Sequence, residues 1–455
     1  MTLWDSLKNE MLKNPFQIVC ENNAKMTYEE LVIFSESFSK KLKNEKCCAI
    51  LCESELAAAM ALLSCFAAGV TAVPLSAKYG VVHCEKILNT ISPTAIITDM
   101  NESLQVTHLA DAKYITPSIH PALIMCTSGT TGTPKGAMLT EENIIANTTD
   151  IIDYFDISRQ DYILISRPLY HCAVLTGEFL VSLLSGAKIR FHSGTFNPKV
   201  LLDILTEHKI TVFCGTPTLL SIMAKFRQAA SKVSLRSICI SGECMDEKTA
   251  SKIATTFPNT YIYHVYGLTE ACPRVCFMPP YLFKDNMSYV GKPLKSVQIK
   301  LVKENGETAN LNEEGILWVK GPNVMVGYYN APEQTARVLR DGWLCTGDIG
   351  LINEKGFLKI LGRSDDLIIR GGMNIYPQEI ESTLKTDSRV NEVMVYKVKG
   401  PIFGEQIGLK ISGDFSDTAE VRKLCSEILP SFQIPSQITL LDELPKNGTG
   451  KIIRR

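Results

Sequence analysis

The stretch that decides the fold spans residues 122–136 and reads ALIMCTSGTTGTPKG. An apolar run, ALIM, leads into a loop that contains glycines, several hydroxyl side chains and Lys135. Glycines let backbone N–H groups turn toward one point and form a nest for an anion, and the lysine adds a positive charge. The loop therefore predicts a polyphosphate site directly after a buried strand.

This loop is not the phosphate loop of the P-loop kinases. The G-x4-G-K-[ST] pattern, counted from Gly129, requires glycine where Pro134 stands and a hydroxyl where Gly136 follows Lys135. A flexible Ser/Thr/Gly linker is the simpler alternative. It is disfavoured because a strand leads in and a helical pattern begins at Glu141. Alone, the loop predicts phosphate binding and no particular reaction.

The surrounding sequence predicts an α/β fold with largely parallel sheets. Near-continuous apolar strands, typical of strands covered on both faces, alternate with helical stretches up to about residue 360. The expected strands are 47–52, 94–99, 122–128, 162–166, 188–191, 211–215, 237–241 and 261–267. The expected helices are 28–42, 56–68, 141–154, 198–208 and 218–229.

The last third of the chain changes in texture. From Ser296 onward, QIKLV, GILWVK and FLKILGR with Gly/Asn/Glu turns predict a small, antiparallel, β-barrel-like sub-domain. The segment GRSDD, 362–366, is the expected boundary to a compact α+β tail. We therefore expect a large domain over 1–362 and a small one over 363–455.

Composition narrows the function classes. The 455 residues carry 47 Lys+Arg and 48 Asp+Glu, a net charge of −1, so no bulk attraction to nucleic acid or anionic membrane is expected. The uncharged stretch Leu56–Leu75 approaches the length of a membrane span. Gly69 and Pro74 interrupt it, and this favours a buried helix followed by a strand over a membrane span.

The 15 cysteines form no C-x2-C pair with a matching histidine motif, so a structural zinc site has no support. Many lie in apolar runs and are expected to be reduced core residues, which implies a reducing compartment. The N-terminal MTLWDSLKNE lacks the pattern of a secretion signal. A cytoplasmic location is therefore expected.

Five motifs together resemble the adenylate-forming superfamily of acyl-CoA synthetases, nonribosomal adenylation domains and firefly luciferase. In chain order they are Ser128–Gly136 (SGTTGTPKG), Tyr266–Glu270 (YGLTE), Trp343–Asp348 (WLCTGD), Gly362–Asp366 (GRSDD) and Pro445–Lys451 (PKNGTGK). Their order matches the family, whereas the first ~120 residues match only in texture. The resemblance implies ATP-dependent activation of a carboxylate to an acyl-adenylate, with pyrophosphate released.

The resemblance assigns the nucleotide site residue by residue. The β- and γ-phosphates go to the loop residues Thr127, Ser128, Gly129, Thr130, Thr131, Gly132 and Lys135. Glu270 would hold Mg²⁺ between phosphate oxygens, as suits a hard cation, and Thr269 would bind the α-phosphate. Solvent-exposed charge is the alternative role for Glu270.

The nucleoside contacts follow in the same way. Tyr266, with Gly267 after it, would offer a flat face to adenine beside Gly242 and Glu243, and a core aromatic is the alternative for Tyr266. Asp348 would accept hydrogen bonds from the ribose, supported by Arg363, with a turn aspartate as the alternative.

The small domain is expected to move. In the family, the lysine matching Lys451 bridges the substrate carboxylate and the α-phosphate, and the residue matching Asp365 is the hinge. The alternative for Lys451 is a solubilising tail lysine. The segment GGMNIYPQE begins with Gly371 and Gly372, which would leave room for a pantetheine arm. It is typical of acyl-CoA ligases, which favours coenzyme A as the thiol acceptor.

The identity of the acid is the least determined point. His171 matches the gate of acyl-CoA ligases, where amino-acid-activating relatives usually carry aspartate, so an α-amino acid is disfavoured. A core histidine is the alternative. Mostly small or apolar wall residues are expected, namely Val174, Phe213, Gly215, Thr216 and Ala271, and no arginine is evident for a second carboxylate. A monocarboxylic fatty or aromatic acid is therefore expected.

Two alternatives remain beside the CoA ligase. One is a stand-alone enzyme that loads the phosphopantetheine of an acyl or peptidyl carrier protein, and the other is a non-catalytic nucleotide-binding protein. Glu243 is more typical of adenylation domains and pulls toward the first, while intact Lys135, Glu270, Asp348 and Lys451 oppose the second. His264 also departs from the family, which more often carries Asn or Gln there.

Overall fold

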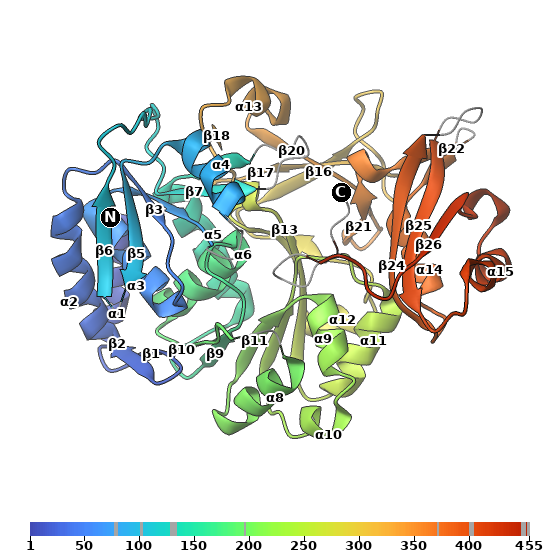
Figure 1. Cartoon of the computed structure of the whole chain (residues 1–455), viewed down its shortest axis with the longest axis horizontal. Coiled ribbons are helices and arrows are strands. Elements are labelled where there is room, and N and C mark those ends of the chain that lie inside the picture. The colour runs from blue at the N-terminus through green and yellow to red at the C-terminus, as the bar shows by residue number, and fades with distance from the viewer. Residues whose placement is uncertain are drawn as a thin grey trace.

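The computed structural model describes residues 1–76, 81–100, 103–127, 134–194, 197–370, 373–399, 405–446 and 452. Two mixed sheets with their helices form a large N-terminal part, a smaller antiparallel sheet follows, and an α+β unit completes the chain (Figure 1). This arrangement confirms the predicted α/β class with a large first domain and a small last one. The boundary at 362/363 stays a prediction.

The first sheet has a parallel centre and antiparallel edges. Its nine strands run in the order β15-β14-β13-β12-β11-β9-β10-β1-β2, and those from β13 to β1 are parallel. In chain order they are β1 (Ile18–Glu21), β2 (Ala24–Thr27), β9 (Tyr162–Ile165), β10 (Lys188–Phe191), β11 (Val212–Gly215), β12 (Ser237–Ile240), β13 (Tyr261–Gly267), β14 (Arg274–Met278) and β15 (Lys292–Pro293).

The second sheet carries the phosphate loop. Its order is β18-β8-β7-β4-β3-β5-β6, with β7, β4, β3 and β5 parallel. The strands are β3 (Cys47–Ile50), β4 (Thr71–Pro74), β5 (Ala95–Met100), β6 (Ser103–His108), β7 (Leu123–Thr127), β8 (Lys135–Leu139) and β18 (Gly327–Tyr328). β7 and β8 pair antiparallel, so the loop predicted from sequence connects two neighbouring strands rather than leading straight into a helix.

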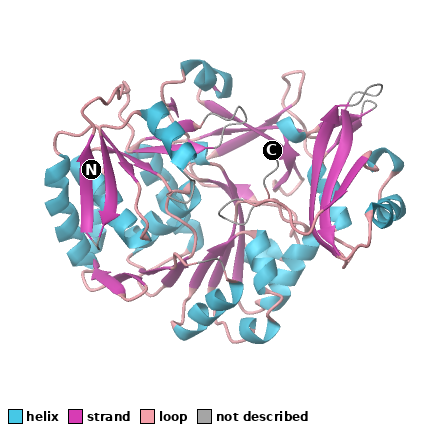
Figure 2. Cartoon of the chain, in the orientation of Figure 1, coloured by secondary structure: helices cyan, strands magenta, loops and turns pink. Residues whose placement is uncertain are grey.

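Helices separate and cover the two sheets (Figure 2). One continuous core joins the facing sides of both sheets through α1 (Leu3–Lys13), α2 (Tyr28–Ser39), α3 (Glu55–Ala68), α5 (Glu141–Phe155) and the run α6 (Cys172–Val174), η3 (Leu175–Leu180) and α7 (Val181–Ser185). A second core lies under α8 (Pro198–Glu207), α9 (Pro217–Met223), α10 (Arg227–Ala230), α11 (Glu247–Thr256) and α12 (Pro280–Phe283). The outer face of the second sheet packs against α4 (Val81–Ile91).

The apolar stretch Leu56–Leu75 folds as its breakers predict. The Ser54 side chain accepts a hydrogen bond from the N–H of Ala57 and begins α3, and Gly69 ends it with a φ of 66°, a left-handed conformation that glycine tolerates. β4 follows at once. None of the helices in the described part of the chain is long and apolar enough to cross a bilayer.

The third sheet is antiparallel, as predicted from residue 296 onward. It contains β16 (Gln298–Val302), β17 (Gly315–Lys320), β19 (Leu339–Arg340), β20 (Trp343–Ile352) and β21 (Leu358–Arg363). α13 (Pro332–Val338) precedes β19. β20 pairs with β17, β19 and β21, and this fixes the motif residues of β20 and β21 side by side.

The C-terminal unit has its own core. It comprises β22 (Ile368–Arg370), β23 (Met373–Ile375), α14 (Pro377–Leu384), β24 (Val390–Lys399), β25 (Glu405–Gly413), α15 (Thr418–Ile428) and β26 (Gln437–Leu440). Short 3-10 helices occur along the described chain at η1 (Lys40–Leu42), η4 (Thr269–Ala271), η5 (Ser364–Asp366) and η6 (Ser431–Gln433).

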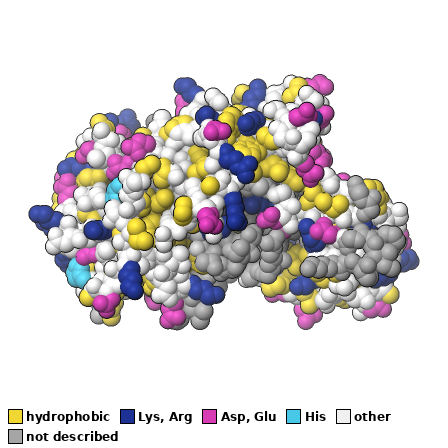
Figure 3. Space-filling view, turned by 90° about the horizontal axis from the view of Figure 1, so that it is seen from above, with side chains coloured by type: hydrophobic (Ala, Val, Ile, Leu, Met, Phe, Trp, Pro, Cys, Tyr) yellow, Lys and Arg dark blue, Asp and Glu magenta, His cyan; other side chains and the backbone are white. Residues whose placement is uncertain are grey.

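Two features agree with the composition. The cysteines are free thiols and most are buried, as expected for reduced core residues. Acidic and basic side chains are interspersed over the face shown in Figure 3, without an extended field of one sign. This distribution agrees with the near-zero net charge.

Candidate active site

The predicted nucleoside residues meet where β13, β20 and β21 come together. The Tyr266 hydroxyl donates a short hydrogen bond to Oδ2 of Asp348, and Arg363 Nη1 donates to Oδ1 at 3.0 Å. Asp348 and Arg363 are direct cross-strand partners in the β20–β21 pair. Both carboxylate oxygens of Asp348 are therefore held in place.

Local backbone chemistry fixes this cluster. A Cβ at Gly267 would lie 1.7 Å from the Pro273 carbonyl oxygen, so only glycine allows the approach of β14. Gly347 adopts a φ of 73°, and the Thr346 hydroxyl accepts the N–H of Asp348 at 3.0 Å. Burial, followed by the Asp348 charge, raises the pKa of Tyr266 far above its usual value, so this phenol remains a donor.

A second polar cluster lies at the phosphate loop and contains a residue that sequence reasoning missed. Tyr328 donates a hydrogen bond to Oε1 of Glu270 at 2.8 Å, and the Lys135 ammonium lies 5.3 Å from the centre of the Tyr328 ring. Tyr328 reaches this point because β18 pairs with β8, which begins at Lys135. The only sequence sign of it is the aromatic pair in VMVGYYN, far from every motif.

The donor set at Glu270 suits magnesium. Nowhere in the described ranges do three or more His, Cys, Asp or Glu side chains gather as an all-protein metal cage. Magnesium is usually bound by one or two carboxylates together with substrate phosphates. One carboxylate beside a lysine and a predicted phosphate loop fits that mode.

Two residues that depart from the family pattern, Glu243 and His264, both have local hydrogen-bond partners. Glu243 does not extend freely: its Oε2 accepts the N–H and hydroxyl of Thr218, at 3.2 and 2.6 Å, in the first turn of α9. This explains its departure from the family as a helix-capping contact. Gly242 has a φ of 94°. His264, the other departure, is buried, and its Nδ1 lies 3.0 Å from the Tyr289 carbonyl oxygen.

The predicted acyl gate, His171, lies at the start of α6. His171 occupies the N-cap position, and its ring lies 4.2 Å from that of Tyr170. Val174 and Ala271 lie in the core between the sheets, as expected of wall residues. Phe213 does not: alternation along β11 places it in the core under α8 and α9, on the opposite face of the first sheet. Phe213 therefore lies on a different face from Val174 and Ala271, and its place in the acyl pocket stays a prediction.

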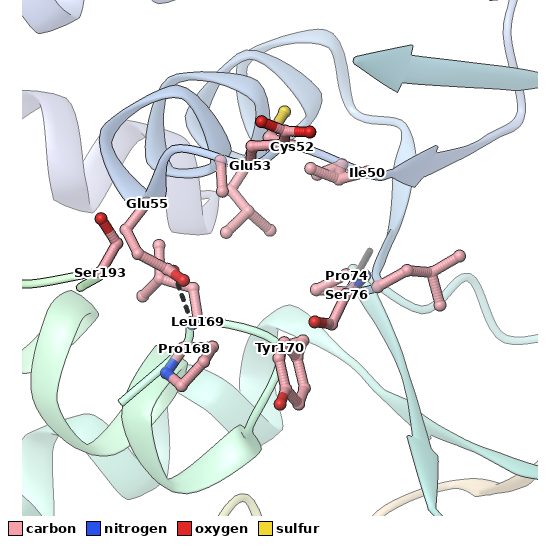
Figure 4. A pocket seen from close by; sticks show the side chains of 13 residues that line it. Ile50, Cys52, Glu53, Glu55, Pro74, Ser76, Pro168, Leu169, Tyr170 and Ser193 are labelled. Atoms are coloured by element: carbon pink, nitrogen blue, oxygen red, sulfur yellow. Dashed lines mark hydrogen bonds between the residues drawn. The ribbon is translucent and has the colours of Figure 1, made fainter. Parts of the chain in front are cut away.

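A cavity of about 380 Å³ opens on the other side of the gate, between the ends of β3 and β4, the start of α3 and residues 168–170 (Figure 4). Glu55 holds its wall by accepting the N–H of Leu169 at 2.9 Å. Glu53 and Glu55 line it, and two carboxylates disfavour a polyphosphate there. The nucleotide is therefore still expected at the Asp348 and Glu270 clusters.

Several predicted residues lie outside the described residues. They are Ser128, Gly129, Thr130, Thr131, Gly132, Gly371, Gly372 and Lys451. Their neighbours are described: Thr127 and Lys135 are cross-strand partners at the base of the phosphate loop. Thr269 lies in η4 with Glu270, and Asp365 is exposed in η5 directly after Arg363.

Comparison with known proteins turns this geometry into an assignment. A profile of the AMP-binding enzyme family matches residues 9–329, and that of the AMP-binding enzyme C-terminal domain matches residues 379–451. The chain belongs to the AMP-binding enzyme family. It is an AMP-forming acid–thiol ligase of the acyl-CoA synthetase type, which uses ATP, Mg²⁺ and coenzyme A.

Relatives within this family agree. Feruloyl-CoA synthase of Amycolatopsis sp is 31% identical over 86% of this chain and 84% of that protein. 2-Succinylbenzoate–CoA ligase of Bacillus velezensis is 30% identical over 95% of this chain and 92% of that protein. The structure of o-succinylbenzoate CoA synthetase from Bacillus subtilis with its acyl-adenylate has a TM-score of 0.86 at 27% identity, and the match covers 100% and 97% of the two chains.

Proposed function

We propose that this enzyme activates a small carboxylic acid at the junction of β13, β20 and β8, and then transfers the acyl group to the thiol of coenzyme A. The observation that carries this proposal is the convergence of two carboxylate clusters, Tyr266–Asp348–Arg363 and Tyr328–Glu270 beside Lys135. One suits a ribose and the other a metal-bound polyphosphate.

In the first half-reaction the acid's oxygen forms a bond to the α-phosphorus of ATP, and the bond to the bridging oxygen of pyrophosphate breaks. Two anions must approach each other, so positive charge and fixed donors decide the rate. Lys135 and the loop 127–132 hold the β- and γ-phosphates, and Thr269 binds the α-phosphate. Glu270 would hold a magnesium ion, which would supply positive charge beside the phosphate oxygens.

Nucleoside binding falls to the other cluster. Asp348, already oriented by Tyr266 and Arg363, accepts the ribose hydroxyls, and the ring of Tyr266 with Gly242 borders the adenine. Because both Asp348 oxygens are pre-positioned, little ordering is required when the nucleotide binds.

The second half-reaction uses the small domain. Lys451 bridges the two anions during adenylation, and rotation at the exposed Asp365 then withdraws it and brings Gly371 and Gly372 toward the acyl-adenylate. The thiol sulfur bonds to the acyl carbon, AMP leaves, and the thiol proton passes to solvent. His171 closes the acyl side during both steps.

Acid-dependent exchange of labelled pyrophosphate into ATP tests the first half-reaction without knowledge of the acceptor. We expect exchange with at least one acid of a broad panel and none without acid. Failure of every acid in the panel would refute the proposal.

Coenzyme A and a holo carrier protein then serve as competing acceptors for the acid so identified. We expect thioester formation with free coenzyme A. Transfer to the carrier protein alone would establish the alternative, a carrier-loading enzyme.

A further inference from the structure

A charged cluster lies buried behind the acyl gate. It consists of Arg167, which follows β9, Glu178 in η3, and Arg274 at the start of β14. The side chain of Glu178 is fully buried, that of Arg167 is 12% exposed, and Arg274 is 2% exposed as a whole residue. Charged side chains are seldom buried to this degree without a reason.

The cluster is incompletely bonded. Arg167 Nη2 donates to Oε1 of Glu178 at 2.5 Å, whereas Arg274 Nη2 makes a weak contact, 3.7 Å, with the sulfur of Cys239. Within the described part of the chain, Oε2 of Glu178 and the Nε atoms of both arginines have no hydrogen-bond partner. Buried polar atoms are nearly always paired, so the cluster is built to receive a polar group.

The charge balance shows the sign of that group. Two guanidinium ions face one carboxylate, and the close Arg167–Glu178 pair leaves the charge of Arg274 in excess. The neighbouring Cys239 thiol is affected by this charge: a hydrogen bond with Cys214, and then the charge of Arg274, lower its pKa to about 7. The site therefore favours an anion beside Arg274.

The gate helix leads from the acyl site to this cluster. Val174 and Glu178 follow the gate residue His171 by three and seven residues along the same helical run. The helix widens into a π-turn over Leu175–Leu180, a feature that re-aims side chains and is frequent at functional sites. A Cβ at Gly177 would lie 3.4 Å from Arg274 Nη2, so this turn of the helix packs directly against the guanidinium.

Strand β12 of the first sheet also leads from the adenylation site to this cluster. Ser241, at the carboxyl end of β12 next to Gly242, and Cys239, beside Arg274, are two residues apart and therefore share a face of the strand. Two strand residues span about 7 Å, so an extended acid of short to medium length reaches from the adenylation site to Arg274. The buried hydroxyl of Ser241 also has no hydrogen-bond partner within the described residues.

We propose that the Arg167–Glu178–Arg274 cluster forms the far wall of the acyl pocket and binds the second carboxylate of a dicarboxylic acid, with Arg274 as its counter-charge. This inference rests on the proposed function and names its substrate class. It replaces the monocarboxylic acid expected from sequence alone. A long alkyl tail would press methylene groups against buried charges and leave the arginine donors unpaired.

The test compares matched acids in pyrophosphate exchange. Each α,ω-dicarboxylic acid from propanedioic to octanedioic acid is paired with the monocarboxylic acid that has a methyl group in place of the second carboxylate. We expect the best dicarboxylic acid to have a KM at least tenfold below that of its partner. Equal or better use of the monocarboxylic partner by the wild-type enzyme would overturn the proposal and would mean that the cluster holds only water.

Arg274→Met removes the charge at nearly constant length, and we expect it to abolish the preference while exchange with the monocarboxylic partner persists. Arg190→Met, a half-buried arginine of the same sheet outside the cluster, is the matched control and should keep the preference. An unchanged preference in folded Arg274→Met would also overturn the proposal. If that variant does not fold, the wild-type comparison decides alone, and absence of exchange with any acid would refute the proposed function instead.

Discussion

The carboxylate clusters at the strand ends and the charged cluster behind the gate differ in how fully their atoms are paired. At the strand ends, the two carboxylate oxygens of Asp348 accept hydrogen bonds from Tyr266 and Arg363. Glu270 accepts one from Tyr328. Behind the gate, Glu178, Arg167 and Arg274 keep polar atoms without partners in the described part of the chain. The strand-end clusters are pre-organised for groups common to every turnover, whereas in our proposal the substrate supplies the missing partner of the cluster behind the gate.

The largest expected effect lies at Lys451. Lys451→Ala removes the cation that the proposal places between the two anions, and we expect pyrophosphate exchange to fall about 10³-fold, or about 4 kcal/mol. Lys423→Ala, an exposed lysine of α15, is the control. Near-normal exchange by Lys451→Ala would show that Lys451 does not bridge the two anions. The strand-end clusters would then have to stabilise their approach.

Asp348→Asn should have the next largest effect. It removes the charge shared by Tyr266 and Arg363 and weakens the acceptor for the ribose, so we expect about a 10²-fold loss of kcat/KM for ATP. Asp341→Asn, an exposed neighbour, should change little. An Asp348→Asn enzyme with wild-type kcat/KM would show that this cluster only stabilises the fold.

The third prediction concerns His264, a buried imidazole that is already hydrogen-bonded to the Tyr289 carbonyl and should therefore remain neutral in the folded protein. Burial lowers its pKa from 6.5 to about 4, so it stays neutral when folded and binds a proton more readily when unfolded. The stability it contributes is complete above pH 6.5 and is lost as pH falls toward 4, about 2 kcal/mol between pH 7 and 5. Denaturant midpoints across this range should fall less steeply for His264→Asn, and parallel curves would contradict this origin.

Tyr328→Phe should have the smallest effect. It deletes one hydrogen bond to Glu270 and keeps the ring beside Lys135, so a loss of about 1 to 2 kcal/mol is expected, seen as a higher KM for ATP with Mg²⁺. Tyr329→Phe, whose hydroxyl accepts the N–H of Ile115, is the matched control. Equal KM values for the two variants would remove Tyr328 from the metal site.

The sequence predicted the parts whose chemistry is local. The apolar strands and the breakers Gly69 and Pro74 correctly predicted the parallel sheets and the buried helix α3. The motif residues Tyr266, Asp348 and Arg363 do meet. Their mutual hydrogen bonds were not foreseen, because motif spacing says nothing about which side chains touch.

The parts that were missed depend on contacts between distant segments. Tyr328 reaches Glu270 through an edge strand of only two residues, too short to leave a periodic pattern. Arg167, Glu178 and Arg274 come from three elements, and nothing in their spacing announces burial. Phe213 stays a prediction, because a continuous apolar strand does not show which of its faces meets the pocket.

The central claim, that this enzyme joins an acid's oxygen to the α-phosphorus of ATP, has one direct test. The acid identified by exchange is labelled with ¹⁸O in its carboxylate and turned over with ATP and coenzyme A, and the phosphorus products are examined by mass spectrometry. The proposed mechanism predicts that one labelled oxygen appears in AMP and none in pyrophosphate. Label in inorganic phosphate, or unlabelled AMP beside newly formed thioester, would contradict it.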